Sequence, residues 1–372
     1  MKCYGRARVA DLVGDTVVYR SLQPADPTLP GFKQLARSPA PGALALPRKG
    51  EESYAAAVAA MIRSAQQRRR PGVAIDRLIY VGDTRMSDGG AFVSLRVAGG
   101  WGGRAFICAE EPSADVTLIN ENEGISTARR WAALARFAAE LDHEGFAWSH
   151  TAVVLDLDKT LIGARGRNSH VIDRARMAAL RTTVASLLAG RFDEASFERV
   201  YSAFNRPAFH PFTGDNQDYL AYLCLMIGAS VVEQAEVEAA VAGGALRRFE
   251  DLLDRVDASP PVDEAVAETH REVAWLVRRG DPTPFKNFRR REFRETAALM
   301  GCAAADTPAQ RLLDREIVLT AEVWVAAMRW KEAGALLMAL SDKPDEAAYP
   351  TAEDAAAGGL PLHRIETHIV GE

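Results

Sequence analysis

The chain has 372 residues, of which 48% are hydrophobic and 26% are charged. This is the composition of a globular protein that is long enough for about two domains. The formal net charge of −5 at pH 7 argues against a protein whose whole surface coats nucleic acid or an anionic membrane. We therefore expect neither a nucleic acid nor a membrane as a partner.

The sequence favours a cytoplasmic protein. No apolar run approaches the ~20 residues that a membrane-spanning helix needs, and the segment Met1–Leu12 lacks the apolar region of a signal peptide. The four cysteines, Cys3, Cys108, Cys224 and Cys302, lie far apart. Such scattered thiols fit a reducing compartment better than a disulfide framework or a paired metal site.

The N-terminal part of the chain contains a predicted hairpin, a loop and a helix. Two β-prone runs flank Gly14 and Asp15, which predicts a hairpin at that turn. Residues 24–48 are rich in proline and glycine and are expected to form a loop. An alanine-rich helix follows over Glu51–Arg70, and the basic residues of its last turn suit the helix dipole.

Strands and helices alternate in the next part of the chain. Strands are predicted over Arg77–Asp83, Arg104–Cys108 and Thr151–Asp158, and a helix is predicted over Thr127–Leu141. The run over Thr151–Asp158 begins with consecutive β-branched residues and leucine. This pattern is typical of a strand that is buried on both faces of a parallel sheet.

Residues 170–330 have a mostly helical pattern, for example over Val171–Leu188 and Gln234–Val256, and strand signals are nearly absent there. Strand–helix alternation that is interrupted by a helical block predicts an α/β domain with a helical insertion. The last part of the chain contains a predicted helix over Thr320–Ala333, a buried strand over Gly334–Ser341 and a half-buried strand over 362–370.

Two carboxylates follow the strand Ala152–Leu155 directly, in the sequence Asp156-Leu-Asp158-Lys-Thr160. Ligands of doubly wound sheets bind at the carboxyl ends of the strands. Asp156 and Asp158 can converge on one site there, because residues two apart on an extended backbone point the same way. Neighbouring carboxylates repel unless a cation neutralises them, and hard oxygen ligands favour Mg²⁺.

A strand followed by Asp-x-Asp-x-Thr resembles the first motif of the haloacid dehalogenase (HAD) superfamily, whose fold is a Rossmann-like α/β core. The resemblance implies that Asp156 is a nucleophile that forms an aspartyl-phosphate and that Asp158 is the general acid and base. It also implies that Asp156 and Asp158 help to bind Mg²⁺ and that Thr160 contributes to phosphate binding.

Two further motifs of the family have counterparts at strand ends. The second motif is a strand that ends in Ser or Thr and binds the phosphoryl group, and Ala335–Ser341 fits this description. The fourth motif is a strand that ends in Gly-Asp, with a further Asp four or five residues on. Leu78–Asp88 matches it, which by the resemblance makes Asp83 and Asp88 metal ligands.

Lysine is rare in this chain, with seven lysines among 45 basic residues, so a lysine beside a motif is informative. Lys49 precedes the helix that leads to the Gly-Asp strand. It matches the third motif, whose lysine pairs with the nucleophile and the phosphate. Lys343, two residues after Ser341, is the rival candidate for this charge.

The motifs occur here in the order third, fourth, first, second, whereas the family usually runs from first to fourth. The chain ends too soon after Ser341 to hold the two missing motifs, and their counterparts lie upstream. This order resembles a circular permutation, which leaves a packed sheet unchanged when the ends of the domain are close. We expect the strand over 362–370 to be the one between the second and third motifs, and the segment from Thr127 to His150 to join the old ends.

The resemblance implies a two-domain organisation. Residues 1–165 and 331–372 are expected to form the Rossmann-like catalytic core with its parallel sheet, and residues 166–330 an α-helical cap. Caps in this superfamily close over the core site, exclude water and carry groups that recognise the substrate.

Several basic residues in the insertion or at its start could contact an anionic substrate. Arg165 and Arg167 lie just beyond the first motif, and the stretch Phe285–Arg294 interleaves basic and aromatic residues. Such a stretch can stack on and pair with a nucleotide or a sugar phosphate. More often it is a helix whose phenylalanines belong to the core and whose arginines are solvated.

The resemblance implies a Mg²⁺-dependent phosphohydrolase that acts on a small phosphorylated substrate. A phosphomutase or phosphotransferase would use the same aspartyl-phosphate and pass the phosphoryl group to an acceptor other than water. A non-catalytic protein that binds a phosphorylated ligand would keep the fold without needing the whole acidic set. A site completed only between subunits is a further alternative, and the sequence leaves both the substrate and the oligomeric state open.

Overall fold

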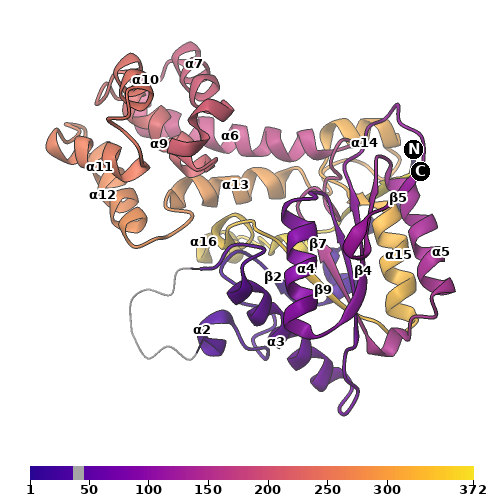
Figure 1. The fold of residues 1–372 in the computed structure, drawn as a ribbon. Coiled ribbons are helices and arrows are strands. Elements are labelled where there is room, and N and C mark those ends of the chain that lie inside the picture. Colours follow the sequence, from indigo (N-terminus) through magenta and orange to yellow (C-terminus); the bar gives the residue numbers. More distant parts are fainter. Residues whose placement is uncertain (37–45) are drawn as a thin grey trace. The chain divides into compact units, whose positions relative to one another are not determined.

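The structure is a computed structural model that describes residues 1–36 and 46–372 (Figure 1). The described residues divide into two compact units. The first unit comprises Met1–Ala175 and Thr296–Glu372, and the second comprises Arg176–Glu295.

The first unit is built on a seven-stranded sheet in the order β2-β9-β7-β3-β4-β6-β5. Neighbouring strands are parallel except for β5 and β6, which pair antiparallel. The predicted α/β class with a parallel sheet is therefore confirmed. The strands of this sheet are β2 (Val17–Val18), β3 (Arg77–Gly82), β4 (Gly102–Cys108), β5 (Leu118–Asn120), β6 (Ile125–Ala128), β7 (Thr151–Asp156) and β9 (Leu336–Leu340).

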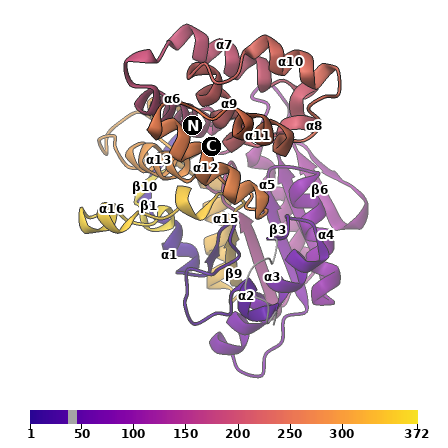
Figure 2. The same ribbon diagram turned by 90° about the vertical axis from the view of Figure 1, so that its left-hand side faces the viewer.

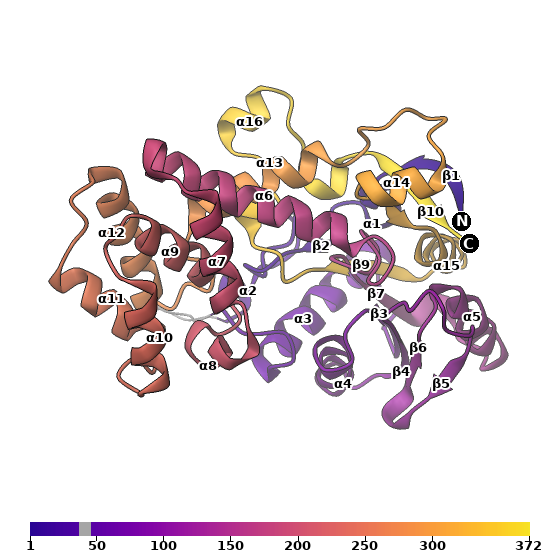
Figure 3. The ribbon, with the colours of Figure 1, turned by 90° about the horizontal axis from the view of Figure 1, so that it is seen from above.

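Helices cover both faces of this sheet (Figures 1 and 3). On one face, apolar residues of α3 and α4 share a core with Leu78 and Tyr80 of β3. On the other face, the ring of Phe106 lies 6.2 Å from that of Trp131 and 5.6 Å from that of Phe137 in α5. Burial on both faces explains why the strands are continuous apolar runs. The helices of the first unit are α1 (Val9–Val13), α2 (Phe32–Leu35), α3 (Glu52–Arg69), α4 (Ser87–Gly99), α5 (Leu134–His143), α14 (Ala309–Arg315), α15 (Ala321–Glu332) and α16 (Ala352–Ala356).

A second, three-stranded sheet in the first unit brings the chain ends together. Its order is β1 (Lys2–Ala7), β10 (Thr367–Gly371) and β8 (Leu319–Thr320). β1 and β10 are antiparallel, with Lys2 opposite Gly371, so the two termini lie side by side (Figure 1). This closeness is the geometric condition for a circular permutation.

The second unit consists of helices (Figure 2). Its core is apolar but also holds charges: Asp218, which is fully buried, accepts hydrogen bonds from Arg289, and Arg289 also pairs with Glu292 at 2.6 Å. Its helices are α7 (Glu194–Phe204), α8 (His210–Thr213), α9 (Gln217–Gly228), α10 (Gln234–Ala242), α11 (Phe249–Ala258) and α12 (Glu264–Arg278), and α6 (Ser169–Leu188) and α13 (Lys286–Ala298) extend into it from the first unit.

The predicted hairpin at Gly14 and Asp15 is wrong. β1 pairs with β10, whereas β2 pairs with β9 in the other sheet. Between them, the carboxylate of Asp11 accepts a hydrogen bond from the backbone N–H of Arg8 at 2.8 Å. This contact caps a one-turn helix, α1, where the sequence pattern suggested the end of a strand.

Two predicted helices differ from the structure. The stretch over Thr127–Leu141 begins as β6, because Thr127 pairs with Ile107 of β4, and the helix starts only at Leu134. Tertiary strand pairing overrides local helix propensity there. The predicted helix over Gln234–Val256 is two helices, α10 and α11, which are separated by a turn at Gly243 and Gly244.

The expected place of the strand over 362–370 is also wrong. Its first residues form a 3₁₀ turn, Leu362–Arg364, and β10 lies in the small sheet and not in the large one. The strand that flanks β9 in the large sheet, on the side away from β7, is β2. The second unit, Arg176–Glu295, spans fewer residues than the expected insertion over 166–330. Residues 37–45, which belong to the expected loop over 24–48, lie outside the described residues.

Across residues 1–36 and 46–372, no helix combines the length and the apolar character needed to cross a membrane.

The adjacency of the termini gives a first testable prediction. A variant in which Glu372 is joined to Met1 by a short Gly-rich loop and the chain is opened after Gly145 should fold and melt within about 5 °C of the parent. The loop at Gly145 is exposed and lies between α5 and β7, so no packed element is cut. Circular dichroism against temperature measures this.

The same fusion opened after Leu95, which is buried in α4, is the control and should lose cooperative unfolding. Equal damage in both variants would show that the pairing of β1 with β10 does not hold the ends close.

Candidate functional site

Three neighbouring parallel strands end at one edge of the large sheet. Asp156 is the last residue of β7, Asp83 directly follows β3, and Ser341 directly follows β9. In the register of the sheet, Asp156 stands opposite Leu340. The sheet therefore brings together residues that lie far apart along the chain, as the sequence predicted.

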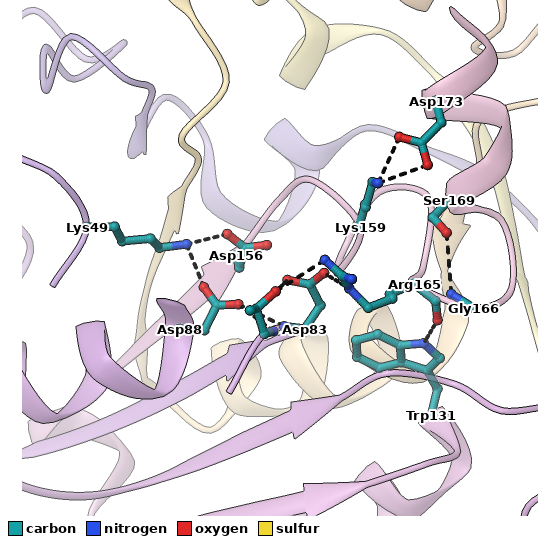
Figure 4. Close-up of polar contacts among 11 residues, drawn as sticks. Lys49, Asp83, Asp88, Trp131, Asp156, Lys159, Arg165, Gly166, Ser169 and Asp173 are labelled. Atoms are coloured by element: carbon teal, nitrogen blue, oxygen red, sulfur yellow. Dashed lines mark hydrogen bonds and ion pairs between the residues drawn. The ribbon is translucent and has the colours of Figure 1, made fainter. Parts of the chain in front are cut away.

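Asp156 lies on the side of the sheet that α3 and α4 cover. Ala152 and Val154 of the same strand belong to the core shared with these helices, and every second residue of a strand faces the same way. On that side, Lys49 Nζ lies 2.6 Å from Oδ1 of Asp156 and 2.6 Å from Oδ1 of Asp88 (Figure 4). The ammonium group of Lys49 thus links Asp156, the first residue of the predicted first motif, with Asp88, the last residue of the predicted fourth motif.

Lys49 belongs to a turn and not to the helix itself, because α3 begins at Glu52. Two contacts hold this turn. The guanidinium of Arg20 donates to the carbonyl of Pro47 at 2.6 Å, and the hydroxyl of Ser94 in α4 donates to the carbonyl of Gly50 at 3.0 Å. Arg20 and Ser94 therefore position the lysine, although neither stands near a recognisable motif.

The carboxylate of Asp88 is saturated with hydrogen bonds. Its Oδ1 accepts from Lys49 at 2.6 Å and from the hydroxyl of Tyr80 at 3.1 Å. Its Oδ2 accepts from the backbone N–H groups of Asp83 at 3.0 Å and Thr84 at 2.9 Å. Since a carboxylate has about four acceptor positions, Asp88 acts here by holding Lys49 and the turn that carries Asp83.

Gly82 is required for this arrangement. A Cβ atom at position 82 would lie 2.5 Å from Cβ of Asp88, closer than two such atoms can approach. The structure therefore explains why a glycine precedes Asp83 in this chain. The glycine leaves room for Asp88, and the backbone that follows it is clamped by the carboxylate of Asp88.

Asp83 is held by a second cation. Its Oδ2 accepts a short hydrogen bond from Nε of Arg165, and its Oδ1 accepts from the hydroxyl of Thr84 at 3.0 Å (Figure 4). Arg165 also donates to the Thr84 hydroxyl at 3.2 Å. The sequence suggested Arg165 as a contact for an anionic substrate, and the structure places it on an acidic side chain.

The acidic residues of this edge could hold a metal ion. One carboxylate oxygen from each of Asp83, Asp88 and Asp156 lies within 4.8 Å of the other two, and all three residues are buried. Hard oxygen donors at this spacing fit Mg²⁺. The carboxylate of Asp158, which was also expected to bind the metal, is not part of this group.

Burial dominates the electrostatics of the cluster. It raises the pKa of Asp83 to about 6, with the charge of Asp88 adding to the shift and Arg165 opposing it. Burial likewise raises the pKa of Asp156 well above its usual value, and Lys49 opposes that shift. Burial disfavours the charge of Lys49 too, but Asp156, Tyr80, Asp88 and Tyr54 together outweigh it and raise the lysine pKa. A divalent cation would favour the ionised carboxylates.

Asp158 has a different partner. Nζ of Lys343 lies 3.6 Å from Oδ1 of Asp158, and the backbone N–H of Lys343 donates to the hydroxyl of Ser341 at 3.0 Å. The two candidate lysines are thus divided between the two carboxylates of the first motif. Lys49 contacts Asp156, as the third motif requires, and Lys343 lies beside Asp158.

Thr160, a predicted phosphate-binding residue, is fully buried. Its carbonyl accepts a hydrogen bond from the hydroxyl of Thr320 at 2.5 Å, and its own hydroxyl has no hydrogen-bond partner among the described residues. Thr160 is therefore not exposed at the surface of the site.

A pocket opens beside Asp158, Ser341 and Lys343. Apart from these three residues its wall is largely apolar. The remaining lining residues are Tyr19, Leu157, Ile162, Ile172, Thr296, Met300, Ile317 and Leu362. All of them belong to the first unit, so this pocket is formed by the same unit as the acidic cluster.

The other basic candidates have structural partners. The side chain of Arg167 is buried and pairs with Glu110 and Glu322, each at 2.8 Å. In the basic–aromatic stretch, Phe285 and Phe288 are core residues of the second unit, and Arg289 pairs with Asp218. The interpretation of this stretch as a helix with buried phenylalanines is confirmed for these rings, whereas Arg289 is buried and not solvated.

Comparison of the chain with protein-family models, with curated proteins and with solved structures finds no match. The family resemblance is therefore a prediction from the motifs of the sequence.

The raised pKa of Asp83 predicts that this residue destabilises the cation-free fold at neutral pH. Because its pKa of about 6 lies above the ordinary 3.8, the stability that its protonated form contributes is lost as the pH rises from about 4 through 6. Asp83→Asn should raise the free energy of unfolding at pH 7.5 by about 1–2 kcal/mol, and the gain should shrink toward pH 5. Urea unfolding in EDTA at both pH values measures it.

Asp142→Asn is the matched control, because Asp142 forms an exposed ion pair with Arg329, and it should change stability by less than about 1 kcal/mol. A gain for Asp83→Asn that grows toward pH 5, or a loss at pH 7.5, would contradict the assigned sign.

Proposed function

We propose that this protein is a Mg²⁺-dependent phosphohydrolase of HAD-like type, with a circularly permuted motif order, that acts on a small phosphorylated substrate through an aspartyl-phosphate. The observation that carries the proposal is the contact of Lys49 with Asp156, at 2.6 Å, in the same cluster as Asp83 and Asp88. Three motifs that lie apart in the sequence supply these four residues. An ion pair that only stabilised the fold would not need these four residues at the carboxyl edge of a parallel sheet, where ligands bind.

In the first half of the proposed reaction, a carboxylate oxygen of Asp156 attacks the phosphorus of the ester. The bond between phosphorus and the leaving oxygen breaks as the bond to Asp156 forms, and Asp158 gives its proton to the leaving oxygen. Mg²⁺, held by Asp83 and Asp156, would neutralise charge on the phosphoryl oxygens. Lys49 keeps Asp156 oriented and offsets its negative charge.

In the second half, Asp158 takes a proton from a water molecule, and the oxygen of that water attacks the phosphorus of the aspartyl-phosphate. The bond to Asp156 breaks, which returns its carboxylate and releases inorganic phosphate. The hydroxyl of Ser341 and the ammonium of Lys343 lie beside Asp158. In the proposed reaction they bind the oxygens of the transferred group while Asp158 exchanges its proton.

The nucleophile gives the direct test. Asp156→Asn should lower kcat/KM for an aryl phosphate in Mg²⁺ by at least about 10³-fold, because an amide cannot form the acyl phosphate. Turnover by the parent should disappear in EDTA. Release of inorganic phosphate measures both effects, and transfer of the phosphoryl group to an added alcohol instead of water would indicate a phosphotransferase.

Asp142→Asn is again the control and should keep full activity. Equal rates for Asp156→Asn and the parent would refute the assigned nucleophile. The absence of turnover over a broad panel of phosphate esters would favour a binding protein.

We expect the leaving group of the ester to lie beside Asp158, where the neighbouring side chains are largely apolar. Met300 lines the pocket beside Asp158, so Met300→Gln should lower kcat/KM for an ester with an apolar leaving group by about 10-fold, more than for one with a hydroxylated leaving group of equal size. Steady-state kinetics on the two esters measure the ratio.

Met86→Gln makes the same change at a side chain that is 90% exposed and should leave the ratio unchanged. A Met300→Gln variant that slows both esters equally would show that the pocket does not receive the leaving group.

A further inference from the structure

The side chain of Arg165 reaches from the loop after β7 to the acidic cluster (Figure 4). Its Nε donates to Oδ2 of Asp83, and a terminal nitrogen donates to the hydroxyl of Thr84 at 3.2 Å. The two partners differ in their access to solvent: the Arg165 side chain is 43% exposed, whereas that of Asp83 is 7% exposed. The guanidinium therefore covers a buried carboxylate from the solvent side.

The backbone of Arg165 is fixed. Its N–H donates to the carbonyl of Lys159 at 2.7 Å, and its carbonyl accepts from the N–H of Glu110 at 3.1 Å and from the indole N–H of Trp131 at 3.3 Å. Gly166 follows with a φ of +78°, and a Cβ there would lie 1.8 Å from the carbonyl oxygen of Glu110. Movement of Arg165 is thus confined to its side chain, which has solvent beside it.

Arg165 and a metal ion would compete for Asp83. Its Oδ1 accepts from Thr84 and its Oδ2 from Arg165, so each oxygen already has one partner. Asp88, the third acidic member of the cluster, has all its acceptor positions filled by other groups. A divalent cation between Asp83 and Asp156 would also lie close to the positive guanidinium, and the two charges would repel.

We propose that Arg165 is an internal cation that occupies Asp83 when no metal is bound, and that its side chain leaves this carboxylate when a divalent cation binds. The proposal rests on the proposed function in taking the cluster as a cation site. Arg165 then sets the apparent affinity for the cation, because the cation must compete with the guanidinium for Asp83. The buried carboxylates are never left without a positive charge.

Titration calorimetry with MgCl₂ tests this exchange without any measurement of activity. Arg165→Gln removes the competitor and should bind Mg²⁺ about 5- to 50-fold more tightly than the parent. Arg85→Gln is the matched control. Arg85 lies two residues from Asp83 and pairs with Glu121 at 2.8 Å, so this variant removes the same charge nearby without opening Asp83, and it should bind within about twofold of the parent. A thermal melt of each variant shows that it is folded.

The outcomes separate the two proposals. If the parent binds Mg²⁺ and Arg165→Gln binds it equally or more weakly, the exchange is refuted and the metal site stands. If both arginine variants tighten binding by the same factor, the loss of a nearby positive charge explains the change, and the exchange is refuted. If neither the parent nor Arg165→Gln binds Mg²⁺, the cation site fails, and the proposed metal-dependent function fails with it.

Discussion

The structure depends on a single constraint: three buried carboxylates at one edge of a parallel sheet must be neutralised. Lys49 does this for Asp156 and Asp88, with 2.6 Å to each, and Arg165 does it for Asp83. Each cation is placed by contacts outside the cluster, Lys49 through Arg20 and Ser94, and Arg165 through its fixed backbone. Without these charges the desolvation of the carboxylates would oppose folding, so the same residues connect stability with the chemistry of the site.

The motif residues could be predicted from the sequence because they stand at strand ends. A buried parallel strand has a clear signature, and β3, β7 and β9 were each expected close to their observed bounds. Once these strands are neighbours, parallel geometry alone brings Asp83, Asp156 and Ser341 to one edge. Lys49 was expected from its rarity and its position, and its contact with Asp156 follows the third motif.

Other features had no local signal. The turn that carries Lys49 is held by Arg20, one of many arginines in the chain, so its role appears only when the carbonyl of Pro47 is seen beside it. Asp88 was expected to bind metal, and only the geometry shows that backbone N–H groups, Tyr80 and Lys49 fill its acceptor positions. The pairing of β1 with β10 joins residues from opposite ends of the chain, and no periodicity reports such a long-range partner.

The proposed reaction forms an acyl phosphate on Asp156, and this step can be tested at a single side chain. Borohydride reduces an acyl phosphate to an alcohol and leaves free carboxylates intact. The protein should be quenched with borohydride during turnover of a phosphate ester and then digested for peptide mass spectrometry. We expect reduction at Asp156 alone, and only when both the ester and Mg²⁺ are present. Reduction at Asp83 or Asp158, or turnover that leaves Asp156 unmodified, would contradict it.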